Sequence, residues 1–354
     1  MQYDVVFYVA YPYYYPHFLP IYEALQKEKL TSLFVLSQEQ NTELMLSIAN
    51  EQDLDYCLGD ENVLETLNAK AMLFAKVPSE TLQTKAKKCF LCHGTGTKQC
   101  GFEKALERCD LVFVEGSYRY EYYTQAFPSF IHKIKQVGYS KLDTILNVSQ
   151  EDKKALQQKY ALDPHKKTIL YAPTFFPSSI EKMSDSFPDD FKGCNIIVKA
   201  HYLSWERSRY KKHVKKFEKW KRFDNCTIIG VEEYNLVPFM ILADLMISDE
   251  SSAIFEFASL DKPVIINRFL KLRWSYYLNP KKLFKRMDKN MDCYRSIGYN
   301  PKNYQEMVEL THHSIENPES FRQERRALAK EVCGTLDGDA SKRIIEAIKE
   351  ICER

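Results

Sequence analysis

Three features are missing from this sequence: a large surplus of basic residues, an apolar run long enough to span a membrane, and a signal peptide. Its 50 Lys and Arg residues against 48 Asp and Glu residues leave a net charge of only +2, so the overall charge does not indicate nucleic acid, and any anionic partner must be bound by local clusters. The longest apolar stretches, such as PFMILADLMI, are too short to cross a bilayer and are interrupted by Asp244, which excludes a transmembrane helix. The N-terminus has neither a basic n-region nor a small-residue cleavage site, so we expect a first strand there and a cytoplasmic protein.

The ten cysteines are expected to be reduced thiols, because a long chain without a secretory signal seldom carries a disulfide framework. The segment CFLCH, Cys89 to His93, matches the pattern of c-type haem attachment and could be extended to a zinc site with Cys100 and Cys109. However, its apolar alternation points Cys89 and Cys92 to opposite faces of a strand, and haem attachment would need an exported protein. We therefore expect neither a metal nor a tightly bound cofactor.

Strands and helices alternate along the whole chain, which favours α/β architecture with parallel sheets covered on both faces. With 354 residues, 45% of them hydrophobic, the chain is long enough for two domains. In the first half we expect strands at Val5–Val9, Ser32–Leu36, Ala71–Phe74, Lys88–Cys92 and Leu111–Val114 and helices at Phe18–Lys29 and Thr42–Glu51. After a boundary between Val137 and Gln150 we expect strands at Thr168–Ala172, Ile196–Lys199, Thr227–Ile229, Leu245–Ser248 and Val264–Asn267 and helices at Glu151–Tyr160 and Ala340–Glu353.

The stretch from Ile241 to Asn267 contains a complete strand–helix–strand unit. Two short apolar runs, Leu245–Ile247 and Pro263–Ile266, are typical of buried parallel strands, and the polar turn Asp249–Ser252 between them offers helix N-caps. A helix that begins at the carboxyl end of a parallel strand presents free backbone N–H groups, which suit a phosphate. The local sequence is equally compatible with an ordinary capped helix.

Two segments of the first half are expected at the carboxyl ends of strands, where open α/β sheets bind ligands. His93 follows an apolar strand in a turn made flexible by Gly94 and Gly96, so it is either a catalytic base or a hydrogen-bonded structural histidine. The segment YPYYYPHF, Tyr11–Phe18, is predicted to be a Pro-punctuated aromatic loop. Its tyrosines either shield a helix end or form an acceptor-binding surface.

Basic residues are interleaved with aromatics in the runs Tyr210–Arg222 and Lys281–Arg286. Such a run usually forms a solvated helix face. The alternative is a docking surface for an anionic membrane or a lipid-linked acceptor, with Phe217 and Trp220 beside the lysines.

Five segments together resemble the CDP-glycerol glycerophosphotransferase family, which includes the teichoic-acid primases and polymerases. In the order in which the family carries them, they are HGTGTK (93–98), LYAPTF (170–175), VKAH (198–201), ISDESSAIFEFASLDKPVI (247–265) and LDGDASKRIIEAI (336–348). Many members have Trp before the histidine and Pro after His-Gly-Thr, where this chain has Cys92 and Gly96. The departure affects the expected donor and acceptor more than the expected chemistry.

The resemblance implies a GT-B fold, in which two Rossmann-like, doubly wound parallel-sheet domains face one cleft. Residues 1–147 would form the acceptor-side domain and 148–335 the CDP-donor-binding domain, and 336–354 would cross back to the first domain as a terminal helix. The implied reaction moves glycerol phosphate, or a similar unit such as ribitol phosphate, from a CDP-activated donor to a hydroxyl of a glycan, teichoic acid, capsule or other cell-surface polymer, and releases CMP. The alternatives are a GT-B glycosyltransferase, a nucleotide-sugar epimerase and a non-catalytic scaffold.

The resemblance also assigns roles to particular residues. His93 would be the general base, and His201 would neutralise the charge that grows on departing CMP. Contacts to the donor would come from the phosphate-binding residues Ser251, Ser252, Thr174 and Lys199 and from Glu256, which would bind the ribose. From their positions at the ends of predicted strands, and not from the resemblance, Lys98, Tyr13 and Tyr14 are expected on the acceptor side. The implied partners are a CDP-glycerol or CDP-ribitol donor, a glycan or lipid-linked acceptor and an anionic surface on the inner face of the cell membrane, with no nucleic acid.

Overall fold

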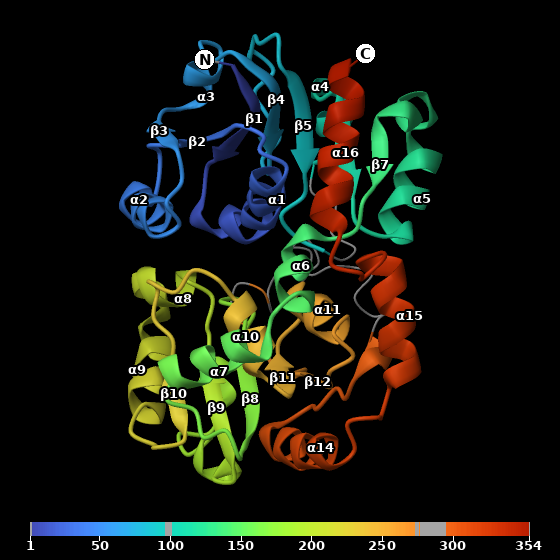
Figure 1. The fold of residues 1–354 in the computed structure, drawn as a ribbon. Helices are drawn as coiled ribbons and strands as arrows, with labels where there is room; N and C mark the ends of the chain where they lie inside the picture. The colour runs from blue at the N-terminus through green and yellow to red at the C-terminus, as the bar shows by residue number, and fades with distance from the viewer. Residues whose placement is uncertain (1, 96–100, 273–275, 277–294, 354) are drawn as a thin grey trace. The chain divides into compact units, whose positions relative to one another are not determined.

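The computed structural model describes residues 2–95, 101–272, 276 and 295–353 (Figure 1). The chain divides into two compact units. Unit 1 comprises Met1–Asn147 and Lys330–Arg354, and unit 2 comprises Val148–Ala329. The predicted second domain runs to residue 335, whereas the chain joins unit 1 at Lys330. Both units are parallel sheets with helices, so the α/β class predicted from the alternation is confirmed.

Unit 1 contains a seven-stranded sheet in the order β3-β2-β1-β4-β5-β6-β7. Every neighbouring pair is parallel, and the central strands are buried along most of their length because both faces are covered. The sequence does not predict the edge strands β3 and β7. Each has only three residues, which is too short for a clear alternation of apolar and polar side chains. The strands are β1 (Tyr3–Val9), β2 (Ser32–Leu36), β3 (Tyr56–Leu58), β4 (Ala69–Phe74), β5 (Lys87–Leu91), β6 (Leu111–Val114) and β7 (Ile134–Gln136).

The predicted loop at Tyr11–Phe18 is wrong, because the segment is mostly helical. A 3₁₀ turn leads directly into α1, and Pro16 stands in the first turn of that helix, where its missing N–H costs no hydrogen bond. The helical segments of unit 1 are η1 (Pro12–Tyr14), α1 (Tyr15–Lys27), α2 (Thr42–Glu51), α3 (Glu61–Leu64), α4 (Phe102–Arg108), α5 (Ser117–Ala126), η2 (Pro128–Lys133), α6 (Ser140–Leu146) and α16 (Ala340–Glu353).

The terminal helix α16 packs against α1, α6, β4 and β5 (Figure 1). Asp143 caps its start, since its carboxylate accepts hydrogen bonds from the backbone N–H groups of Ala340 (3.2 Å) and Ser341 (2.7 Å). The chain reaches this position through Gly334, whose φ of +78° suits glycine. A Cβ there would lie 2.3 Å from the carbonyl oxygen of Glu115.

Unit 2 contains a five-stranded parallel sheet in the order β10-β9-β8-β11-β12. Its strands are β8 (Lys167–Ala172), β9 (Cys194–Val198), β10 (Cys226–Ile228), β11 (Leu245–Ser248) and β12 (Val264–Ile266). Its helical segments are α7 (Gln150–Lys159), η3 (Ile180–Lys182), η4 (Asp189–Phe191), α8 (Leu203–Glu206), η5 (Ser208–Tyr210), α9 (Lys211–Trp220), α10 (Val237–Leu242), α11 (Ala253–Ala258) and α14 (Tyr304–Glu316). Helix α15 (Arg322–Val332) crosses the boundary between the units.

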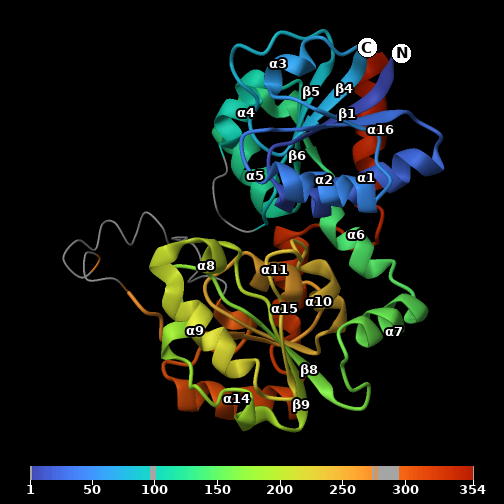
Figure 2. The same cartoon turned by 90° about the vertical axis from the view of Figure 1, so that its left-hand side faces the viewer.

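Helix α9, which follows α8 (Figure 2), carries most of the first basic run. Phe217 and Trp220 are fully buried in the core of unit 2 and His213 is also buried, whereas Lys211, Lys212, Lys215 and Lys219 are exposed. The aromatics therefore anchor the helix to its own sheet and cannot insert into a membrane. The second run, Lys281–Arg286, lies outside the described residues. In the part of the chain that is described, no helix is long and apolar enough to span a bilayer.

Candidate active site

His93 lies just past the carboxyl end of β5, in a half-buried position. Its Nδ1 is 2.7 Å from the carbonyl oxygen of Ala75, which follows β4. A carbonyl oxygen can only accept, so the ring proton lies on Nδ1 and Nε2 keeps its lone pair. This tautomer is the one that a general base requires.

The surroundings of His93 keep its imidazole neutral. Burial lowers the pKa of His93 below its usual 6.5, and the positive charge of Arg119 lowers it further, against the opposing hydrogen bond to Ala75. A ring with a lowered pKa is unprotonated at pH 7, so its lone pair is available to take a proton.

Two of the predicted acceptor-side residues contact this histidine. The ring centroids of Tyr13 and Tyr14 lie 5.5 and 5.1 Å from that of His93. Tyr14 is only 1% exposed, so it supports the histidine ring from inside the protein and cannot itself bind an acceptor. Tyr13 is half-buried, and Lys98 lies outside the described residues.

The positive charge near His93 belongs to Arg119, whose buried contact with Glu115 was not predicted from the sequence. Nη1 of Arg119 donates to both carboxylate oxygens of Glu115, at 2.7 and 2.8 Å, and both side chains are almost completely buried. Glu115 lies between β6 and α5, whereas Arg119 lies in the first turn of α5. Nothing in the sequence shows that the pair is enclosed beside the histidine.

In unit 2, Asp249 links the segment that follows β11 to the segment that follows β8 through hydrogen bonds. It follows β11, is fully buried, and accepts hydrogen bonds from the backbone N–H of Thr174 (3.0 Å), the hydroxyl of Ser178 (3.1 Å) and the backbone N–H of Ser179 (3.2 Å). Burial raises the pKa of Asp249 to about 6, against the lowering effect of these hydrogen bonds. Asp249 thus anchors the loop that contains Thr174, Ser178 and Ser179.

Thr174 is engaged within the same loop. Its hydroxyl lies 3.3 Å from Oδ2 of Asp249 and also donates to the carbonyl oxygen of Pro177. Both partners are acceptors, so the single hydroxyl proton is already used. A contact from this hydroxyl to a donor phosphate would require that bond to be exchanged.

His201 lies past the carboxyl end of β9 and carries the opposite tautomer to His93. The backbone N–H of Leu203 donates to its Nδ1 at 3.2 Å, so the proton lies on Nε2, which is then a donor. The ring stacks on Tyr202 and contacts Phe175, with centroids 4.7 and 4.8 Å away. This desolvation lowers the pKa of His201 to about 4, helped by the charges of Lys199 and Arg207, although part of the residue is exposed.

The role expected of His201 toward departing CMP stays a prediction. With a pKa of about 4 the ring carries no charge at pH 7 and offers an N–H hydrogen bond. Lys199 is the nearby cation. Burial lowers its pKa to about 8, against the raising effect of Glu233 and Glu232, which leaves the ammonium mainly charged at pH 7.

The serine pair precedes the short helix α11. The hydroxyl oxygen of Ser251 accepts from the backbone N–H of Ala253 at 3.3 Å, which leaves its own proton to donate elsewhere. Ser252 is exposed and stands at the N-cap position without a side-chain cap bond. Glu256 is only 3% exposed within α11, so ribose hydroxyls could reach it only if the carboxylate became accessible.

Two arginines, neither anticipated from the sequence, converge next to the serine pair. Glu250 accepts from Nη1 of Arg268 at 2.6 Å and from Nη2 of Arg295 at 2.8 Å, all through Oε1. Arg268 could have been found as a residue just past the strand β12, whereas Arg295 has no signal in the local sequence.

Metal ligation has no geometric support in the described part of the chain, where no three His, Cys, Asp or Glu side chains lie close enough together to hold an ion. The eight cysteines within it are free thiols. Cys89 and Cys92 are both fully buried, as expected for positions in a strand whose two faces are covered.

Comparison with curated proteins shows similarity to enzymes that act on teichoic acids. The chain is 35% identical over 123 residues to the teichoic acid glycerol-phosphate primase of Bacillus spizizenii, covering 33% of this chain and 29% of the primase. It is 22% identical over 279 residues to the teichoic acid glycerol-phosphate transferase of Staphylococcus aureus, covering 72% and 64%. The chain thus matches less than two thirds of the length of either relative.

Solved structures with the same fold include a form of the wall teichoic acid polymerase TagF soaked with CDPG. It has a TM-score of 0.72 and 16% identity, covering 99% of this chain and 89% of the polymerase. UDP-GlcNAc 2-epimerase from Neisseria meningitidis also matches, with a TM-score of 0.65 and 15% identity over 99% and 100% of the two chains. These likenesses confirm the predicted GT-B class of fold.

The family itself is shown by its sequence profile, described as CDP-Glycerol:Poly(glycerophosphate) glycerophosphotransferase, which matches residues 4–350. The match includes all five segments whose resemblance was noted above. This chain therefore belongs to the CDP-glycerol:poly(glycerophosphate) glycerophosphotransferase family of enzymes.

Proposed function

We propose that the protein transfers glycerol phosphate, or a similar polyol phosphate such as ribitol phosphate, from a CDP-activated donor to a hydroxyl of a glycan or cell-surface polymer. The observation that carries this proposal is the family match over residues 4–350. The site geometry supports it, because a neutral histidine with a free lone pair and a cluster of phosphate-compatible donors stand at the carboxyl ends of the strands.

In the proposed reaction, the acceptor oxygen attacks the β-phosphorus of the donor. A new P–O bond forms, the bond from that phosphorus to the bridging oxygen breaks, and CMP leaves with the electron pair. Nε2 of His93 takes the proton from the acceptor hydroxyl. Attack at phosphorus separates this chemistry from that of glycosyltransferases of the same fold, which attack an anomeric carbon.

Charge on the departing CMP is stabilised by two different groups in this proposal. The ammonium of Lys199 supplies positive charge, while Nε2–H of the neutral His201 donates a hydrogen bond. Ser251 and Ser252 would hold the diphosphate, Asp249 would hold Thr174 and its loop in place, and Glu256 remains the candidate for the donor ribose.

The same proposal extends to the residues that contact the acceptor and to the location of the protein in the cell. Tyr13, beside His93, and Lys98 would contact the acceptor, which is a glycan or lipid-linked polymer. Such an acceptor would bring the protein to the cytoplasmic face of the membrane as a peripheral enzyme. The buried Phe217 and Trp220 leave only charge to attract an anionic surface through α9.

A donor panel tests the proposed function against the two alternatives. We expect CDP-glycerol or CDP-ribitol, at about 100 times its dissociation constant, to stabilise the protein by roughly 2.7 kcal/mol and to raise Tm by several degrees. UDP-GlcNAc at the same concentration should leave Tm unchanged. Stabilisation by the UDP-sugar alone would instead indicate a glycosyltransferase or epimerase, and no shift with any nucleotide would favour a scaffold.

A further inference from the structure

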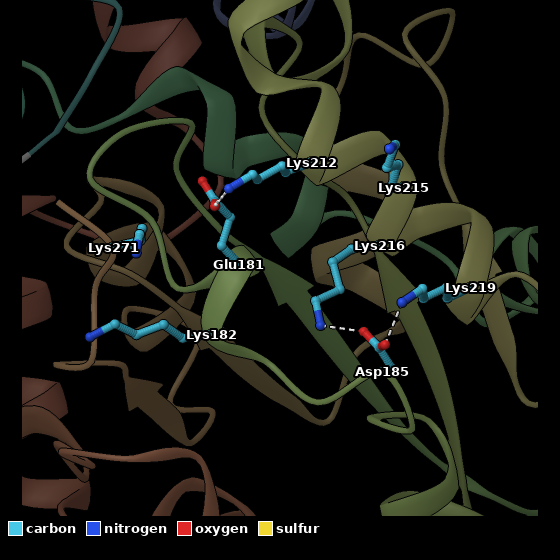
Figure 3. Close-up of a pocket in the computed structure, with 8 residues that line it drawn as sticks. All are labelled: Glu181, Lys182, Asp185, Lys212, Lys215, Lys216, Lys219 and Lys271. Carbon is cyan, nitrogen blue, oxygen red and sulfur yellow. Dashed lines mark hydrogen bonds and ion pairs between the residues drawn. The ribbon is translucent and has the colours of Figure 1, made fainter. Parts of the chain in front are cut away.

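A cation-lined pocket of about 380 Å³ lies between η3 and α9 in unit 2 (Figure 3). We call it the lysine groove. Six lysines and only two carboxylates line it, which gives the lining a net charge of +4 in a protein whose total is +2. Its residues are Glu181, Lys182, Asp185, Lys212, Lys215, Lys216, Lys219 and Lys271.

Only half of these lysines make ion pairs with the two carboxylates. Asp185 accepts from Lys216 and Lys219 together, and those two contacts lower its pKa to about 2 (Figure 3). Lys212 lies 3.6 Å from Glu181.

The other three lysines of the groove, Lys182, Lys215 and Lys271, are exposed. Within the described residues, no carboxylate pairs with any of them. The groove therefore presents three uncompensated ammonium groups to solvent.

The lysine groove continues toward the proposed donor site. An adjoining pocket of about 750 Å³ shares Glu181, Lys212 and Lys271 with it and is also lined by Phe175 and Ser178. Ser178 donates to Asp249, and its carbonyl oxygen accepts from the backbone N–H of Lys271 at 2.7 Å.

Phe175 lies at the other end of this connection. Its ring contacts that of His201 at 4.8 Å. A ligand chain could thus run from the groove to the place where CMP is proposed to leave.

The shape and chemistry of the groove select the kind of polyanion. A lipid surface is flat and is usually bound with inserted apolar side chains, whereas this site is concave and the aromatics of α9 are buried. None of the large hydrophobic residues found exposed in the described chain belongs to η3 or α9. Spaced ammonium groups in a groove suit a flexible chain with one phosphodiester charge per repeat.

We propose that the lysine groove binds the phosphodiester backbone of the polyol-phosphate polymer to which the enzyme adds units. The inference rests on the proposed function, since it takes the acceptor to be a polymer of the transferred unit. Lys182, Lys215 and Lys271 then increase affinity for long acceptors through charge alone. Acceptors of one or two repeats gain nothing from the groove.

The test measures binding of fluorescently labelled glycerol-phosphate oligomers, a dimer and a dodecamer, to the full chain. The triple change K182E/K215E/K271E is expected to weaken dodecamer binding by about 100-fold at low salt, at about 1 kcal/mol for each lysine. The triple change should also make the slope of log affinity against log salt concentration shallower by roughly 2, because each lost phosphate contact removes about 0.7 from that slope. The neutral triple K182Q/K215Q/K271Q should show a smaller loss in the same direction.

The matched control is K154E/K302E/K330E, which changes the charge equally at lysines outside the groove. It should retain dodecamer binding, and both triples should retain CDP-glycerol binding and turnover with the dimer. Equal dodecamer affinity in the groove variant and the control would overturn the groove while leaving the proposed function intact. If K182E/K215E/K271E binds the dodecamer normally but no longer binds anionic vesicles, the polymer-binding proposal is overturned and the groove is a membrane-binding surface. Absence of CDP-glycerol binding in the unmodified protein would contradict the proposed function separately.

Discussion

Replacing His93 with Ala is expected to lower turnover by roughly two to four orders of magnitude. The reason is the tautomer: the Ala75 carbonyl holds the ring proton on Nδ1, so Nε2 is the group able to accept the acceptor proton. Affinity for the CDP-activated donor should change little, because the base acts on the acceptor. Steady-state kinetics together with calorimetric donor binding would separate the two effects.

The pH profile gives an independent readout of the same base. Burial and Arg119 lower the pKa of His93 below 6.5, so the active neutral form persists to mildly acidic pH and is lost as pH falls through that lowered pKa. This acid limb should disappear from the residual activity of H93A. The exposed His132, also in unit 1, provides the control, and H132A should retain full turnover. Turnover of H93A within a few-fold of the unmodified protein would show that the base lies elsewhere.

Replacing His201 with Ala should lower turnover by roughly two to three orders of magnitude, the usual effect of removing one hydrogen-bond donor to a developing charge. The contribution is an N–H bond and not a positive charge, since Leu203 holds the proton on Nε2 and the pKa is about 4. The variant H201Q keeps an uncharged amide N–H and should recover part of the lost rate. Measurements of kcat between about pH 6 and pH 8 should show no limb that depends on His201.

Two controls make the role of His201 distinguishable from a structural one. His165 is an exposed histidine of unit 2, and H165A should behave like the unmodified protein. The melting temperature of H201A should also stay close to normal, because the ring is partly exposed. If H201Q were as slow as H201A and the acid limb moved with both, His201 would act in its protonated form and the neutral assignment would be wrong.

Periodicity in the sequence predicted the elements that place the site but not the contacts within it. The bounds of β11, Leu245–Ser248, follow directly from an apolar run and a polar turn, and the same kind of signal places His93 at the end of a strand. In contrast, Asp249 and Thr174 are 75 residues apart along the chain, and no local pattern predicts that one accepts a hydrogen bond from the other.

The sequence also could not predict which ring nitrogen of each histidine donates and which accepts a hydrogen bond. The opposite tautomers of His93 and His201 depend on a backbone carbonyl in one case and a backbone N–H in the other, and neither group is encoded by residue type. Residue spacing likewise left two interpretations of α9 open. The structure shows that Phe217 and Trp220, three positions apart, occupy the buried face, so only the charged residues of α9 remain available for docking.

Transfer of a polyol phosphate from a CDP-activated donor can be followed by phosphorus NMR of a reaction mixture. With CDP-glycerol and a glycerol-phosphate oligomer as substrates, the diphosphate signals should disappear as CMP and a new phosphodiester appear in equal amounts. Omitting the acceptor should stop the reaction. Release of CMP with free glycerol phosphate and no phosphodiester, or no consumption of any CDP-activated polyol, would contradict the account.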